Sequence, residues 1–204
     1  FICHSMGGLI VKQVLRDANE RKNVDPALCA LLTHTRAVVF IATPHTGSGK
    51  ASLLERLSAW TLISSSAKSL VANSPELRNL NTGYRTLADE RKAELSHLAF
   101  FEMESTPLGM IVDPGASDPG LVGCRPIPIK ADHLAICKPE HRHSQVYAAT
   151  LALIRGITPS ASPAGTLRPA QLPTYKNKQS FRYLFGAAIR AAILFLALFL
   201  VWKS

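Results

Sequence analysis

The C-terminal part of the sequence contains no acidic residue from His141 to Ser204. Eight of the 23 lysine and arginine residues lie in this stretch, so residues 1–140 hold 15 basic against 14 acidic groups. The tail therefore carries +8 of the net charge of +9, and residues 1–140 carry +1. A nucleic-acid-binding protein is expected to gather its basic residues on one face of a recognisable module. The charge distribution therefore argues against a nucleic acid as partner.

Cysteine is also scarce, and the spacing of the four cysteines matches no metal site. Cys3 and Cys29 lie in apolar patterns and are interpreted as small buried side chains. A reducing compartment is the simpler interpretation of such cysteines. We expect no metal ion and no organic cofactor.

The first residues have the pattern of a nucleophile elbow. The apolar run Phe1–His4 ends at Ser5, a short turn follows, and then a helical pattern begins. An α/β-hydrolase elbow has this form, written G-x-S-x-G, and small residues flank the serine because strand and helix approach closely. Cys3 replaces the first glycine, while Gly7 and Gly8 supply the second half. Because an elbow lies in mid-domain and no initiator methionine is present, we expect a fragment whose earlier strands precede Phe1.

The segments after the elbow have the apolar patterns of helices and strands in turn. Ile10, Val14 and Ala18 predict the buried stripe of a first helix, and the unbroken run Arg36–Ala42 predicts a strand buried on both faces. Lys50–Leu87 is helical in pattern and is either a cap over the site or a set of ordinary packing helices. Further predicted elements are the helices Pro26–Leu32 and Ser144–Ile154 and the strands Leu95–Met103, Met110–Val112 and Ile127–Ile129. We expect an α/β fold, namely the C-terminal half of an α/β-hydrolase with a parallel sheet flanked by helices.

The composition changes after residue 155. Residues 156–180 are rich in proline, serine and alanine and are interpreted as a basic linker. Residues 184–202 then form a run of 19 residues with Arg190 as the one charge, about the length that crosses a bilayer. We therefore divide the chain into a partial hydrolase domain (1–155), the linker, and a transmembrane helix with a short tail (181–204).

The predicted span also has an orientation. Lys176, Lys178 and Arg182 precede the apolar run, whereas only Lys203 follows it. Basic residues collect on the cytosolic side of a membrane span. We expect a single-pass C-terminal membrane anchor with the hydrolase domain on the cytosolic side.

A serine nucleophile needs a base, and a third group must orient that base. In α/β-hydrolases the chain order is serine, acid, histidine. His133 follows the last extended segment and is the predicted base. His45, on the loop with Thr43 after the second strand, precedes any acid, so it is expected to line the pocket or to hydrogen-bond the loop. His4 adjoins Ser5 and is expected to point away from it.

The acid is chosen among four carboxylates that lie between or beside these residues. Glu102 ends a predicted strand, at the sheet edge where an orienting carboxylate belongs, and is preferred. Asp113 in the next turn is the alternative. Glu104 lies two residues beyond Glu102, and Asp132 cannot easily orient the ring of its own neighbour.

The oxyanion formed by attack on an acyl group needs N–H donors. One donor is expected to be the backbone N–H of Met6, at the N-terminus of the helix that follows Ser5. The second is expected from a loop that precedes Phe1. We therefore expect the 204-residue chain by itself to be inactive.

Several stretches together resemble the serine-active-site-containing (SERAC-type) lipase/esterase family of α/β-hydrolases, which is similar to the GPI inositol-deacylase type. They are His4–Leu9, Ala42–Ser48, Leu77–Asn81, Phe100–Glu102 and Ile127–Pro139. The resemblance covers residues 1–155 and implies a hydrolase of carboxylic esters, lipids among them. It implies Ser5 as nucleophile, His133 as base and Glu102 as acid.

Two hypotheses follow. The leading one is a membrane-anchored serine esterase that forms an acyl-Ser5 intermediate and acts on an ester or lipid substrate. The alternative is a non-catalytic, membrane-tethered, hydrolase-like binding module. The order of Ser5, Glu102 and His133 along the chain favours the enzyme.

Overall fold

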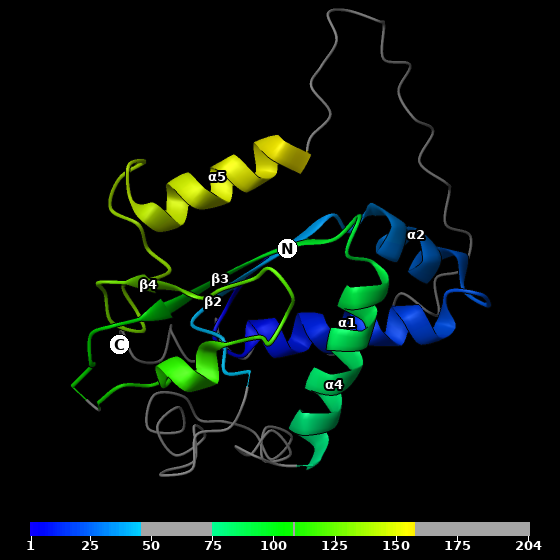
Figure 1. Ribbon diagram of the computed structural model, residues 1–204, viewed down its shortest axis with the longest axis horizontal. Coiled ribbons are helices and arrows are strands. Elements are labelled where there is room, and N and C mark those ends of the chain that lie inside the picture. The colour runs from blue at the N-terminus through cyan, green and yellow to red at the C-terminus, as the bar shows by residue number, and fades with distance from the viewer. Residues whose placement is uncertain (46–74, 108, 158–204) are drawn as a thin grey trace, which may run out of the picture. The chain divides into compact units, whose positions relative to one another are not determined.

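The computed structural model describes residues 1–45, 75–107 and 109–157. The strands there are β1 (Ile2–His4), β2 (Ala37–Ile41), β3 (Ser96–Glu102) and β4 (Ile127–Ile129), and the helices are α1 (Gly7–Arg21), α2 (Pro26–His34), α4 (Pro75–Glu90), the 3₁₀ helix η2 (Pro114–Ser117) and α5 (Gln145–Ile157). The strands form one parallel sheet in the order β1-β2-β3-β4. Figure 1 shows α5 on one side of β2 and β3, with α1 and α4 on the other. This is the α/β organisation that the sequence predicts.

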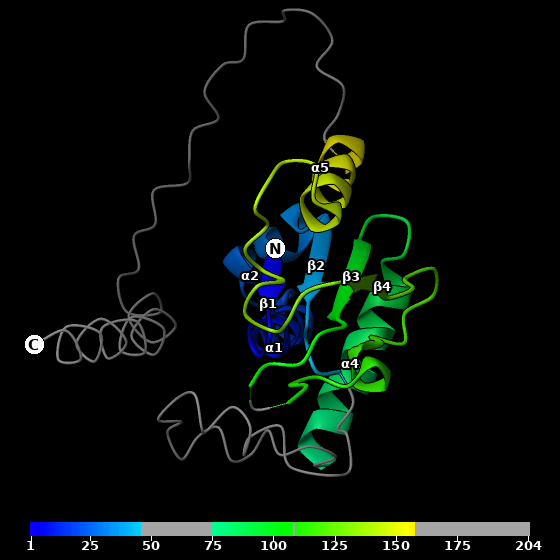
Figure 2. The ribbon, with the colours of Figure 1, turned by 90° about the vertical axis from the view of Figure 1, so that its left-hand side faces the viewer.

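Strand β2 lies inside the sheet and is buried along its whole length. Because side chains alternate between the faces of a strand, Val38 and Phe40 pack with α1, α2 and α4, whereas Val39 and Ile41 pack toward α5. The turned view in Figure 2 shows β2 between β1 and β3. The prediction of a strand buried on both faces is confirmed.

Helix α1 presents a different face to the sheet than the one predicted. Its buried residues are Gly8, Leu9, Lys12, Leu15 and Ala18, whereas Ile10 is 61% exposed. A Cβ on Gly8 would lie 2.4 Å from Oγ1 of Thr43, just beyond β2. The missing side chain therefore allows the close approach that selects this face, and the predicted stripe is wrong at Ile10.

Two other predicted segments differ from the structure. Met110–Val112 forms no strand, because the backbone N–H groups of Ile111 and Val112 donate to the Glu102 carboxylate and not to a neighbouring strand. Of the helical segment Lys50–Leu87, the described part belongs to α4, which packs against α1. Residues 50–74 lie outside the described residues.

Among the helices of residues 1–45, 75–107 and 109–157, none is both long enough and apolar enough to cross a membrane. The predicted span, residues 184–202, lies outside the described residues. So does nearly all of the predicted linker, residues 156–180, although α5 continues to Ile157. These segment boundaries stay predictions.

Candidate active site

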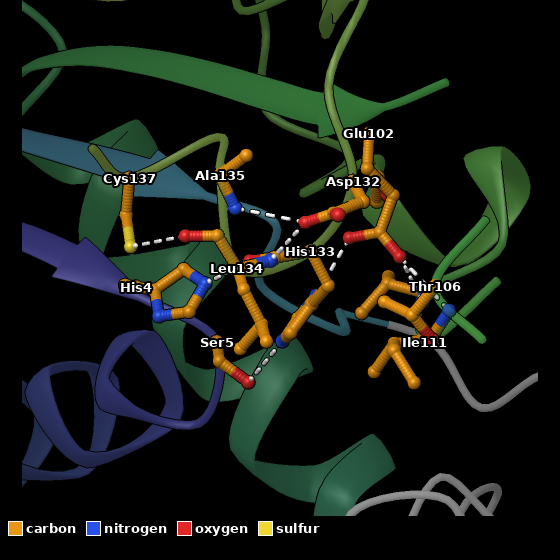
Figure 3. A network of polar contacts seen from close by, with 12 residues as sticks. His4, Ser5, Glu102, Thr106, Ile111, Asp132, His133, Leu134, Ala135 and Cys137 are labelled. Carbon is orange, nitrogen blue, oxygen red and sulfur yellow. Dashed lines mark hydrogen bonds and ion pairs between the residues drawn. The ribbon is translucent and has the colours of Figure 1, made fainter. Parts of the chain in front are cut away.

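The predicted nucleophile, base and acid meet at one edge of the sheet. Parallel strands bring their carboxyl ends to the same edge, where the ligands of open α/β sheets bind. Ser5 follows β1, Glu102 ends β3, and His133 lies on the segment after β4. Figure 3 shows their side chains pointing toward one another from these separate elements.

Ser5 occupies a strained position at the apex of the turn. Its φ is +53°, in the left-handed region that non-glycine residues rarely adopt. Its N–H donates to the carbonyl of Ile41 at 2.9 Å, and its own carbonyl accepts from Gly8 at 3.2 Å. Strain of this kind costs about 1–3 kcal/mol and persists where surrounding contacts enforce it. The turn therefore has the form of a nucleophile elbow, tied directly to β2.

His133 bridges the other two residues. Its Nε2 lies 3.0 Å from Oγ of Ser5, and its Nδ1 lies 2.6 Å from Oε2 of Glu102. His133 is only 3% exposed; its contact with Glu102 is buried, whereas its contact with Ser5 is partly buried. With the proton on Nδ1, the ring donates to Glu102 and its Nε2 accepts the Ser5 hydroxyl hydrogen. This tautomer makes Nε2 available as a base for Ser5.

The Glu102 carboxylate is fully buried and its second oxygen also has partners. Oε1 accepts the backbone N–H groups of Ile111 and Val112, both at 2.9 Å. A buried carboxylate requires such donors, because it has lost its hydration. Asp113, the alternative acid, is instead the N-cap residue directly before η2. The structure thus places Glu102, and not Asp113, against His133.

Two further polar contacts hold the segment that carries His133. His4, predicted to point away from Ser5, donates its Nε2–H to the His133 carbonyl at 2.8 Å, and the rings of these two histidines lie 4.8 Å apart. Burial lowers the pKa of His4, which favours the neutral ring that makes this contact. Asp132 accepts from the N–H groups of Leu134 and Ala135, and these bonds lower its pKa. Both residues therefore fix the backbone at the base and directly after it.

The predicted site loop lies behind the elbow. Thr43 and His45 are 1% and 0% exposed, so neither faces solvent. His45 donates its backbone N–H to Ala116 and accepts from Asn81 at its carbonyl, which corresponds to the loop-bonding interpretation. Met6 is the N-cap of α1, so its N–H lies at the positive end of the helix dipole, next to Ser5.

The sequence interpretation missed Lys12 and Asn81. Lys12 Nζ lies 2.7 Å from His45 Nδ1 and 2.6 Å from Asn81 Oδ1. A lysine in an amphipathic helix pattern usually lies on the solvated face, so the pattern carried no signal for its burial. The position of Asn81 in the sequence also gave no signal for its contacts, because its partners come from α1 and from the loop after β2.

The opposite end of the sheet has a cavity of about 380 Å³. It lies where β3 begins, and its lining includes Arg85, Lys92, His97, Val122 and Cys124. None of the residues around Ser5 contributes to it, so it is separate from the candidate active site. In the described part of the chain, no three His, Cys, Asp or Glu side chains are arranged to hold a metal ion.

Comparison with known proteins finds similarity to SERAC1 proteins of several vertebrates. The chain is 34% identical over 160 residues to Protein SERAC1 of Danio rerio, 32% over 159 residues to that of Mus musculus, and 31% over 160 residues to that of Homo sapiens. Each match covers 76% of this chain, which spans 23% of the length of these relatives. No family model and no solved structure matches the chain. The similarity supports a SERAC-type family.

Proposed function

We propose that this chain carries the catalytic triad of a SERAC-type serine esterase with an α/β-hydrolase fold. The observation that supports this most is the unbroken chain of hydrogen bonds from Ser5 through His133 to Glu102. The strained φ of Ser5 at the sheet edge and the similarity to SERAC1 proteins are independent support. The chain spans 23% of the length of those relatives. The activity of the whole protein is therefore proposed here together with the triad.

In the first step, Oγ of Ser5 attacks the carbonyl carbon of an ester. Nε2 of His133, 3.0 Å away, takes the hydroxyl proton as the new C–O bond forms. Glu102 accepts a hydrogen bond from Nδ1–H and stabilises the imidazolium that results. The imidazolium then gives its proton to the leaving alkoxide, which departs as an alcohol and leaves acyl-Ser5.

In the second step, water attacks the acyl group and His133 takes a proton from that water. The proton passes to Ser5 Oγ as the acid product leaves. In both steps the N–H of Met6 stabilises negative charge on the carbonyl oxygen, since it lies at a helix N-terminus beside Ser5. One donor of this kind typically contributes a factor of about 10²–10³ in rate. In these steps Ser5 is the nucleophile, His133 the base and then the acid, Glu102 the group that orients the ring, and Met6 one of the oxyanion donors.

The substrate class within this proposal is a carboxylic ester, and lipid esters fit it best. The apolar run at residues 184–202 is the support, because a span there would hold the site beside lipid substrates. The cytosolic orientation rests on the basic residues that precede that run. The resemblance to lipases and to the GPI inositol-deacylase type also favours a lipid ester as substrate within this proposal.

Hydrolysis of 4-nitrophenyl butyrate tests the proposal. The protein is expressed from its complete natural reading frame, as wild type, as Ser5→Ala and as the control Ser105→Ala, which alters an exposed serine. Ser5→Ala is expected to lower kcat by at least about 10³-fold, with no change in the control. Hydrolysis at the uncatalysed rate by both Ser5→Ala and wild type would favour the hydrolase-like binding module instead.

A further inference from the structure

The buried amine of Lys12 is the group that the proposed reaction leaves unexplained. Lys12 lies in α1, two turns beyond Ser5, and is 0% exposed. Its Nζ donates to His45 Nδ1 and to Asn81 Oδ1. It also lies 5.3 Å and 5.4 Å from the ring centroids of Phe40 and Tyr84. A buried amine is costly unless its donors are paired; here two hydrogen bonds and two aromatic rings surround it.

The electrostatics of this cluster are consistent with its geometry. Burial, followed by the charge of Arg85, lowers the pKa of Lys12 to about 7. Burial lowers the pKa of His45 well below its ordinary value, and the charge of Lys12 adds to this effect. His45 is therefore neutral and accepts at Nδ1. An amine and an ammonium can both donate the two hydrogen bonds, so the contacts do not depend on the charge of Lys12.

The cluster joins three segments that are distant in sequence. Lys12 belongs to the helix that follows the nucleophile, His45 to the loop after β2, and Asn81 to α4. Asn81 Nδ2 also donates to the backbone carbonyl of His45, so Lys12 and Asn81 hold the side chain and the main chain of His45. The loop and α4 are therefore both tied to α1 at the same point.

The same loop contacts the surroundings of both Ser5 and Glu102. Thr43 packs so closely on Gly8 that a Cβ there would lie 2.4 Å from its Oγ1, and Gly8 in turn donates to the Ser5 carbonyl. On the other side, the His45 N–H donates to the carbonyl of Ala116 at 2.6 Å. Ala116 lies in η2, shortly after the two N–H groups that bind Glu102. A shift of this loop would therefore disturb both ends of the triad.

We propose that Lys12 is a positioning residue for the reaction at Ser5, which fixes the loop after β2 and α4 against the nucleophile helix. The inference rests on the proposed esterase function. Lys12 acts through His45 and Asn81 to keep Ser5 Oγ at hydrogen-bond distance from His133, and it touches no reacting atom. Misplacing a reacting group by about 1 Å costs about 10²-fold in rate, so the effect falls on the chemical step.

The test is the rate of fluorophosphonate labelling at several probe concentrations, which separates the maximal rate constant from the half-saturating concentration. The protein is again expressed from its complete natural reading frame. Lys12→Met keeps the length of the side chain and removes its donors. Lys22→Met is the matched control, because Lys22 caps the same helix, and its hydrogen bond to Asn19 is exposed.

Lys12→Met is expected to lower the maximal rate constant by about 10- to 100-fold, while the half-saturating concentration changes by less than about 2-fold. Lys22→Met is expected to label as wild type does. A merely structural role would lower the urea midpoint and leave the maximal rate of the folded protein unchanged, and that result would overturn the inference.

Asn81→Asp provides a second route if Lys12→Met does not fold. It keeps an acceptor for Lys12 and removes the donor to the His45 carbonyl, so we expect the maximal rate constant to fall by about 3- to 10-fold. An unchanged rate constant would overturn the inference. Ser5→Ala distinguishes the two proposals: if it labels as wild type does, the esterase function fails and this inference falls with it. If Ser5→Ala stops labelling while Lys12→Met and Asn81→Asp label as wild type does, the esterase function stands and only the role of Lys12 is wrong.

Discussion

His133 Nε2 lies 3.0 Å from Ser5 Oγ, although 128 positions separate the two residues in the sequence. Their strands, β4 and β1, are the outer strands of the described sheet. Three strand spacings of about 4.8 Å place the ends of these strands roughly 14 Å apart. The segment after β4 therefore has to cross the ends of β3 and β2 to reach Ser5. The contact of His4 with the His133 carbonyl holds that segment from the β1 side.

Replacing Glu102 by glutamine tests the acid. Glu102→Gln keeps the shape but puts an NH₂ group against either His133 Nδ1 or the N–H groups of Ile111 and Val112. If it faces His133, the ring must carry its proton on Nε2, where it can no longer accept from Ser5. We expect ester-hydrolysis kcat to fall by about 10²–10⁴-fold.

Two control variants accompany this measurement. Glu104→Gln changes an exposed carboxylate two residues further along the chain, and Asp113→Asn changes the alternative acid. Both are expected to leave kcat within about 3-fold of wild type. A large loss in Asp113→Asn with none in Glu102→Gln would assign the acid to Asp113.

The close contact of α1 with the loop after β2 predicts a loss of stability in Gly8→Ala. The added Cβ would lie 2.4 Å from Oγ1 and 2.5 Å from Cγ2 of Thr43. Overpacking of this kind costs about 1–3 kcal/mol in the free energy of unfolding, measured by urea denaturation. Gly7→Ala is the control, because nothing lies within 4 Å of a Cβ there.

A double variant identifies the atoms responsible. Thr43→Ala removes both Thr43 atoms that the Gly8 Cβ would meet, so Gly8→Ala should cost less in that background than in wild type. An equal cost in the two backgrounds would mean that the contact with Thr43 is not the cause.

His97 predicts a dependence of stability on pH. Its Nε2 lies at hydrogen-bond distance, 2.9 Å, from the Tyr84 hydroxyl oxygen, and burial, together with the charge of Lys12, lowers its pKa to about 4 from an ordinary 6.5. Above pH 6.5 the ring is neutral in both the folded and the unfolded chain. As the pH falls from 6.5 toward 4, the unfolded chain binds the proton first, so the free energy of unfolding decreases.

His97→Gln, which keeps an acceptor for Tyr84, should remove this component. Between pH 7 and pH 4, wild type is expected to lose about 1–2 kcal/mol more than the variant in urea unfolding. This is less than the full shift implies, because the side chain is partly exposed. Parallel curves for the two proteins would contradict the assignment to His97.

The positions of Ser5 and His133 could be predicted because each lies next to a strand end with a recognisable pattern. The elbow, the buried run of β2 and the chain order of α/β-hydrolases all point to the same sheet edge. The sequence pattern leaves Glu102 and Asp113 as alternatives for the acid. The choice between them depends on the backbone donors Ile111 and Val112, which looked like a short strand because apolar residues alone do not show whether a segment will find a strand partner.

The cluster around Lys12 could not be predicted, for a different reason. Helical periodicity assumes that apolar residues mark the buried face, and it chose Ile10, which is exposed. The buried face is decided by the glycine at position 8 and by the polar partners of Lys12, which come from two distant segments. Tertiary contacts of this kind leave no local pattern.

The site of a covalent fluorophosphonate adduct tests the assignment of Ser5 as the nucleophile most directly. The protein, expressed from its complete natural reading frame, is labelled, digested and analysed by mass spectrometry. We expect the phosphonyl group on the peptide that contains Ser5 and no adduct in Ser5→Ala. An adduct on another residue, or labelling of Ser5→Ala at the wild-type rate, would contradict the assignment of Ser5 as the nucleophile.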